Sequence, residues 1–107
     1  MNTTIRQIML YIRMNACNDI SLKKVAEKFY LNQSYLSRIF REKTGITFWA
    51  YVTQVRLEKA KEMLKNEHLS LYEIAYQCGF NSVKNFHAVF KKHLGCTPGV
   101  YRKQIAN

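Results

Sequence analysis

The stretch VAEKFYLN at residues 25–32 has a second version later in the chain, IAYQCGFN at residues 74–81. In both versions an aliphatic residue and an alanine come first, a large apolar residue is seventh and an asparagine is eighth. The similarity continues once one extra residue is allowed in the second copy, so that the offset grows from 49 to 50. The later pairs are Leu36 and Phe86, Ile39 and Val89, Phe40 and Phe90, Arg41 and Lys91, Gly45 and Gly95, Thr47 and Thr97, and Tyr51 and Tyr101. The chain is therefore made of two related units in tandem.

Each unit has the pattern of two short helices separated by a tight turn. A serine in a capping position precedes the first helix of each unit, and apolar residues then recur on one stripe, at 22–29 and 71–78. A second helix is predicted after each turn, at 33–43 and 82–93. The capping serines are Ser21 and Ser70, and the glycines expected to stop the second helices are Gly45 and Gly95. This pattern is typical of a helix-turn-helix.

The two turns differ at the position that follows the first helix of each unit, where a positive φ angle is often required. Gly79 can adopt a positive φ angle without steric cost at the end of its helix. Tyr30 stands at the equivalent place in the first unit. We therefore expect the first turn to be made differently or to be strained.

The rest of the chain also reads as helix. A longer helix without glycine or proline is predicted at 48–64, and an opening helix at about 5–15 covers the first unit. A closing helix begins near Pro98, a residue tolerated in the first turn of a helix. We predict an all-α, homeodomain-like fold of seven helices in one domain, residues 1–107. Its parts are a first helix-turn-helix unit at about 5–45, a linker helix at about 48–64 and a second unit at about 70–103.

The charge balance favours a polyanionic partner. Lysine and arginine total 17 against 7 aspartate and glutamate, which gives a net charge of +10, and no acid follows Glu73. Aromatic and aliphatic residues interleave with the late lysines, which indicates a folded basic face rather than a disordered arm. Nucleic acid is the leading candidate partner and an anionic membrane surface the second. The alternative is a basic soluble domain whose charge serves no particular partner.

Other classes of protein have little support. No apolar run is long enough to span a membrane, and the start lacks the apolar core of a signal peptide. The three cysteines are odd in number, and Cys78 and Cys96, with His87 and His93 between them, lack the spacing of paired zinc ligands. No catalytic triad or phosphate loop is present. We expect a cytoplasmic protein that is not an enzyme and needs no metal or cofactor.

The second helices carry the residues expected to bind DNA. On the first of them Ser34, Ser37, Arg38 and Arg41 share a face, and a shift of 50 gives Lys84, His87, Ala88 and Lys91 on the other. Both faces lack acids. A helix of this kind fits the major groove, where arginine can bind guanine through two hydrogen bonds. Base contacts are expected from Gln33, Ser34, Ser37, Arg38, Lys84, Asn85 and His87. Phosphate contacts are expected from Asn32, Arg41, Ser82, Lys91 and Lys92.

Several of these residues, and two aromatic residues near them, also have an interpretation that involves no DNA. Arg38 and Arg41 could form a solvated face, which would be favoured if the architecture were not repeated. Tyr35 could stack on the DNA backbone or be partly buried beside a neighbouring isoleucine. His87 could be an ordinary exposed side chain, and Trp49 is expected to be a packing residue.

Two long stretches resemble the AraC type of bacterial transcription regulators. EIAYQCGFNSVKNFHAVFKKHLGCTPGVYRK at 73–103 resembles the family's signature. SLKKVAEKFYLNQSYLSRIFREKTGITFWAYVTQVRLEKAKEML at 21–64 is similar to its first motif and linker helix. The resemblance implies seven helices, with both recognition helices on one side and in major grooves about one helical turn apart. Because the units are in tandem, one monomer should read an asymmetric site.

The resemblance has further implications for partners. Such domains contact RNA polymerase, usually as activators, and YLNQSYLSRIF resembles regulators whose N-terminal part is a phosphorylated receiver domain. The chain is then expected to be the C-terminal part of a longer regulator, with a stand-alone regulator of this length as the alternative. The isolated domain is expected to be a monomer and the full-length protein a dimer. Two departures concern the second unit, because the family often has arginine at Ala88 and an acid at Ser82. The alternative function is a sequence-tolerant DNA-binding or protein-interaction module.

Overall fold

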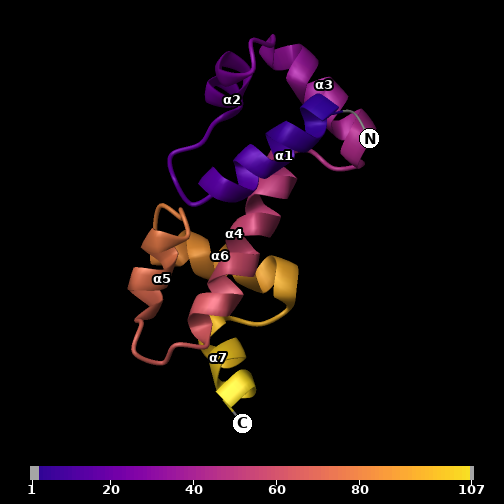
Figure 1. The fold of residues 1–107 in the computed structure, drawn as a ribbon. Coiled ribbons are helices and arrows are strands. Elements are labelled where there is room, and N and C mark those ends of the chain that lie inside the picture. The colour runs from indigo at the N-terminus through magenta and orange to yellow at the C-terminus, as the bar shows by residue number, and fades with distance from the viewer. Residues whose placement is uncertain (1–2, 107) are drawn as a thin grey trace. The chain divides into compact units, whose positions relative to one another are not determined.

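The computed structural model describes residues 3–106, and this part of the chain is helical with no strand (Figure 1). The helices are α1 (Thr3–Asn15), α2 (Leu22–Lys28), α3 (Gln33–Thr44), α4 (Phe48–Leu64), α5 (Leu71–Gln77), α6 (Val83–Leu94) and α7 (Pro98–Ala106). The predicted all-α fold with two tandem helix-turn-helix units and a long linker helix is confirmed. The chain divides into two compact units, and the boundary between Val55 and Arg56 lies inside α4.

The first unit, up to Val55, is built around apolar residues from four helices. The stripe of α1 is buried at Ile5, Ile8 and Ile12, as its spacing predicts. Phe40 of α3 is fully buried and its ring lies 6.1 Å from that of Phe48, at the start of α4. The other buried members of this core are Ala16, Ile20, Val25, Ala26, Leu36, Tyr51, Val52 and Val55. This core fixes α3 by one side only, so its opposite side is left to solvent.

The second unit, from Arg56 onward, is organised by a chain of aromatic rings. The ring centroid of Phe86 lies 5.1 Å from that of Phe80 and 5.7 Å from that of Phe90, which in turn lies 5.5 Å from that of Tyr101. Contacts of this kind add to the free energy gained by burying the rings. Leu57, Ala60, Leu64, Ile74, Ala75, Cys78 and Pro98 are also buried in this unit. The packing holds α6 by Phe86 and Phe90, as Leu36 and Phe40 hold α3.

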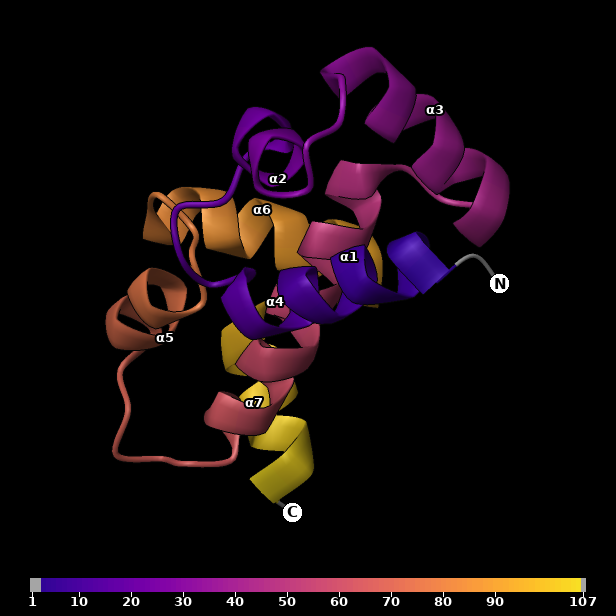
Figure 2. The same ribbon diagram turned by 45° about the horizontal axis from the view of Figure 1, so that its top comes forward.

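The turns of both helix-turn-helix units have the same hydrogen bonds. The N–H of Leu31 donates to the carbonyl of Ala26 at 2.8 Å, and that of Phe80 donates to Ala75 at 3.0 Å. The preceding residue in each unit, Tyr30 or Gly79, donates a second bond of 3.2 Å, and the two bonds together form the Schellman arrangement that ends many helices. Figure 2 shows α2 followed by α3 across such a short connection.

The expectation for Tyr30 is resolved in favour of strain. Tyr30 has a φ of 58° and Gly79 a φ of 92°, so the tyrosine makes the turn that the glycine makes. A side chain in this region is unfavourable by roughly 1–2 kcal/mol. Tyr30 is also 96% exposed, so packing of its ring offsets none of this strain. The first turn is therefore less stable locally than the second.

Candidate nucleic-acid interface

Helix α3 is capped at both ends by its own sequence. The side-chain oxygen of Asn32 accepts hydrogen bonds from the backbone N–H groups of Ser34 at 2.8 Å and Tyr35 at 3.2 Å. Gly45 ends the helix with a φ of 83°, as predicted. With Leu36 and Phe40 buried, the exposed side carries all the residues proposed for this helix: Gln33, Ser34, Ser37, Arg38 and Arg41.

Arg38 lies between two neighbours on the exposed side of α3. Its guanidinium carbon is 5.3 Å from the centre of the Tyr35 ring, one turn earlier. Its Nη1 is 3.6 Å from Oε1 of Glu42, one turn later. The prediction that this face lacks acids is therefore wrong, because Glu42 reaches the arginine expected to read a base. Tyr35 is 42% exposed and lines a shallow hollow with Leu31 and Ile39, so it combines exposure with partial burial.

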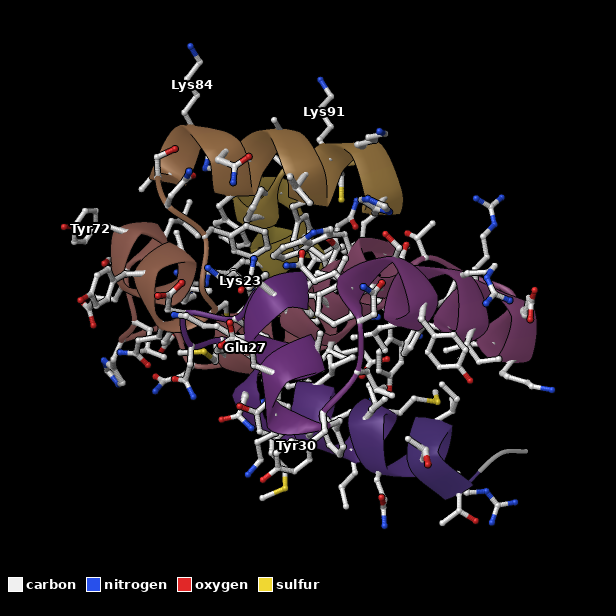
Figure 3. The ribbon with its side chains drawn as sticks, turned by 90° about the horizontal axis from the view of Figure 1, so that it is seen from above. Lys23, Glu27, Tyr30, Tyr72, Lys84 and Lys91 are labelled. Atoms are coloured by element: carbon white, nitrogen blue, oxygen red, sulfur yellow. The ribbon has the colours of Figure 1, made fainter. Side chains whose placement is uncertain are left out.

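Helix α6 repeats the scaffold of α3 with different exposed residues. Ser82 is its N-cap, since its Oγ accepts a hydrogen bond from the N–H of Asn85 at 2.9 Å, so the helix begins at Val83 rather than at 82. Gly95 ends it with a φ of 82°. Lys84 and Lys91 extend from the same side of α6 in Figure 3. Asn85 and Lys92 are exposed as well. No acid occurs within α6, so this face carries no negative charge.

His87 differs from the other proposed base contacts. It is only half-exposed, and its Nε2 is buried and has no hydrogen-bond partner. Its ring lies 6.3 Å from that of Phe86, one residue earlier. The interpretation as a plain exposed side chain is wrong. A base contact through Nε2 would require the ring to turn outward, which weakens His87 as a candidate.

The capping residues have limited capacity for phosphate. The side-chain oxygens of Asn32 and Ser82 accept hydrogen bonds from their own helices. The only donors that these two side chains can offer a phosphate are the amide nitrogen of Asn32 and the hydroxyl hydrogen of Ser82. Arg41, Lys91 and Lys92 are exposed and have no such restriction.

Three exposed aromatic residues were not expected to be so open. Trp49 is 47% exposed although it contacts Phe48 edge-on at 5.4 Å, so its prediction as a packing residue holds only in part. Tyr72 and Tyr76 of α5 are 69% and 75% exposed and were not singled out from the sequence. They border a hollow of about 60 Å³ that Ser82 also lines. Their position off the apolar stripe of α5 was the signal that could have found them.

The described residues offer few other kinds of site. Within residues 3–106, no three His, Cys, Asp or Glu side chains gather as a metal ion would require. In the same part of the chain, no helix combines the length and the apolar character needed to cross a membrane. The pKa of Asp19 is lowered by a hydrogen bond from Lys24 and by the positive charge of Lys24.

This architecture defines a helix-turn-helix DNA-binding domain. A family model described as a helix-turn-helix domain matches residues 25–104, which is most of the chain. The chain belongs to the AraC family, whose members are DNA-binding transcription regulators rather than enzymes.

Particular relatives and solved structures support the assignment. The xylose operon regulatory protein of Escherichia coli K12 is 38% identical over 96 residues, which are 90% of this chain and 24% of that protein. The C-terminal domain of AraT, a response regulator from Geobacillus stearothermophilus, is 34% identical with a TM-score of 0.92, covering 96% of this chain and 86% of that one. The DNA-binding domain of AdpA in complex with a target DNA shares the fold, with a TM-score of 0.87 at 23% identity, over 94% and 90% of the two chains. The chain spans between 24% and 37% of the length of the first curated relatives.

Proposed function

We propose that residues 1–107 are one DNA-binding domain that recognises a specific double-stranded site, with α3 and α6 in two adjacent major grooves. The observation that carries this proposal is the repeated second helix. In both units it is capped at each end and buried along one side, and it presents polar and cationic side chains on the other. Because the two units repeat in tandem, the site they read is asymmetric.

Roles for individual side chains follow from their type and exposure. Arg38 is the main base-reading residue, since a guanidinium can bind O6 and N7 of guanine together. Gln33, Ser34 and Ser37 read neighbouring bases, and Lys84 and Asn85 do so for α6. His87 contributes only if its ring turns outward. Arg41, Lys91 and Lys92 bind phosphates, assisted by Asn32 and Ser82.

The proposal extends to the longer protein. The similarity to a small part of an operon regulatory protein and to the C-terminal domain of a response regulator supports the proposal that the chain is the DNA-binding part of a longer transcription regulator. It would act where bacterial DNA is, in the cytoplasm. RNA polymerase is its expected protein partner. The domain by itself is monomeric, and the full-length protein is dimeric.

Selection of DNA from random duplexes tests the proposal. At near-physiological salt we expect two enriched blocks about 10 base pairs apart from centre to centre. In Arg38→Ala the block read by the first unit should blur. The matched control is Arg6→Ala, which removes an exposed arginine from α1 in the same unit and should leave both blocks intact. Absence of any enriched block, with binding that disappears steeply as salt rises, would refute sequence-specific recognition.

A second candidate function is binding to DNA with little sequence preference. The observation in its favour is Ala88, which leaves α6 without an arginine at the place equivalent to Arg38. The variants Arg41→Ala and Lys91→Ala distinguish phosphate contacts, which position the protein on DNA, from contacts that read the bases. If both residues bind phosphate, each change should weaken binding to cognate and scrambled duplexes equally. Each should also reduce the slope of log affinity against log salt concentration by about one. A loss confined to the cognate duplex would assign them to base reading instead.

A further inference from the structure

Helix α3 contains one acidic residue, Glu42, although the helix is proposed to lie against a polyanion. An acid there should oppose binding unless it has a purpose. We propose that Glu42 is a specificity-determining residue, which acts through Arg38 and penalises binding to non-cognate DNA. This inference rests on the proposed function, because it presumes that Arg38 reads a base.

Glu42 lies close enough to Arg38 to influence where its guanidinium points, without using all of its hydrogen-bond donors. The 3.6 Å between Nη1 of Arg38 and Oε1 of Glu42 is an ion-pair contact, longer than a good hydrogen bond. Both side chains are more than half exposed, at 62% and 54%. The ring of Tyr35, one turn earlier in the helix, restricts the positions open to the guanidinium on its other side. Because a guanidinium has five N–H donors in one plane, contact with one oxygen leaves the others available to a base.

The second unit provides an internal comparison. The residue equivalent to Arg38 is Ala88, and the residue equivalent to Glu42 is Lys92. Helix α6 therefore lacks the guanidinium and the carboxylate together, and it has no other acid. The acid occurs in the helix that has an arginine to control, and in the other helix its place is taken by a cation.

The effect on specificity follows from where Arg38 must go on each kind of DNA. On a non-cognate duplex its guanidinium would pair with a phosphate, which brings the carboxylate of Glu42 toward other phosphates of the same charge. At a guanine the planar guanidinium uses two donors for the base edge and can stay near Glu42. The acid is then less unfavourable on the cognate site. Specificity often depends on such a repulsive element.

The test compares the binding of Glu42→Gln and of wild type to two duplexes. One is the cognate duplex obtained by the DNA selection, and the other has the base-pair block read by the first unit scrambled. Glu42→Gln should tighten binding to the scrambled duplex by about two- to fivefold, the range expected for one exposed charge, and the cognate duplex by less. The ratio of the two Kd values should fall accordingly. The matched control is Glu27→Gln, the same charge change on α2, which should leave the ratio unchanged.

A double-mutant cycle shows whether Glu42 acts through its neighbour. In the Arg38→Ala background, Glu42→Gln should no longer alter the ratio. If it still does, Glu42 contacts the DNA itself, for example by accepting from the amino group of cytosine, and the inference is overturned. It is also overturned if Glu42→Gln leaves the ratio of the otherwise wild-type protein unchanged. If wild type itself does not distinguish the duplexes, the proposed function fails first and this inference fails with it.

Discussion

Helices α3 and α6 have the same scaffold and different exposed chemistry. In both, the residue preceding the helix caps it through a side-chain oxygen, and a left-handed glycine ends it with an N–H bond of 2.9 Å to the carbonyl of the cationic residue four positions earlier. The exposed sides share only that cation, Arg41 or Lys91. The first helix has Arg38 with Glu42, and the second has Ala88 with Lys92.

The difference teaches that the fold and the binding surface have separate requirements in this chain. Buried aromatic and aliphatic residues, caps and glycines determine where each helix lies, and they recur in both units. The exposed residues play no part in that packing, so they can differ without changing the scaffold. The following predictions test how far the two units are equivalent.

The largest effects are expected in the two cores. Phe40 and Phe90 occupy equivalent, fully buried positions, and replacing either by alanine should lower the free energy of unfolding by about 3–5 kcal/mol. Urea unfolding followed by circular dichroism and by the fluorescence of Trp49 measures both variants. Equal losses with coincident transitions would support equivalence. A transition in Phe90→Ala that circular dichroism detects before the fluorescence does would show that the second unit unfolds separately.

Smaller losses are expected at the helix caps. Asn32→Ala and Ser82→Ala should each cost about 0.5–2 kcal/mol, because each removes the acceptor for backbone N–H groups at the start of its helix. Asn32→Ala should cost more, since Asn32 accepts two such bonds and Ser82 one. Thermal unfolding gives the comparison, with Asn32→Ser and Ser82→Asn as conservative controls that keep the caps. A greater loss in Ser82→Ala would contradict this ranking.

The turns should respond in opposite directions. Tyr30→Gly should raise stability by about 0.5–1 kcal/mol, because relief of the left-handed strain exceeds the entropy cost of glycine. Gly79→Ala should lower stability by about 1 kcal/mol for the same reason reversed. Tyr30→Phe keeps the strain and removes only an exposed hydroxyl, so it should change little. Destabilisation by Tyr30→Gly would mean that the exposed ring contributes more than its strain costs.

The smallest effect concerns a charge that only the first unit has. Asp19 pairs with Nζ of Lys24 at 2.6 Å, whereas His68 and Glu73 occupy the matching places in the second unit. Because the pair lowers the pKa of Asp19, its stabilisation is present above the unfolded pKa and is lost as pH falls through the folded one. Between about pH 5 and pH 2, the Tm of wild type should therefore fall slightly more than that of Asp19→Asn. Parallel pH profiles would show that the pair adds nothing.

Much of the fold could be predicted from the sequence because its determinants are local. The serines before α2 and α5 cap them, the glycines after α3 and α6 end them, and the apolar stripes are buried. Strain at Tyr30 was one of the two outcomes expected from its alignment with Gly79, and its φ angle decides between them. These features depend on residues within one helix or turn, or on a comparison of the two copies.

The details of the candidate interface were less predictable because they depend on side-chain conformation. Spacing allowed Glu42 to reach Arg38, but only the structure gives their contact. His87 shares a face with exposed residues, yet its Nε2 is buried. The partial exposure of Trp49 likewise depends on which neighbours cover its ring.

Arg102 joins distant parts of the second unit in a way that the first unit does not match. Its Nε donates to the carbonyl of Leu64 at 3.1 Å and its Nη2 to that of Asn66 at 3.2 Å, across a separation of 38 and 36 residues. The equivalent residue of the first unit is Val52, which has no side-chain donor. In terms of chain topology, these bonds close a long loop whose two ends are the linker helix and α7. A protein truncated before Arg102 would lose this closure and would leave the carbonyls of Leu64 and Asn66 without these two donors.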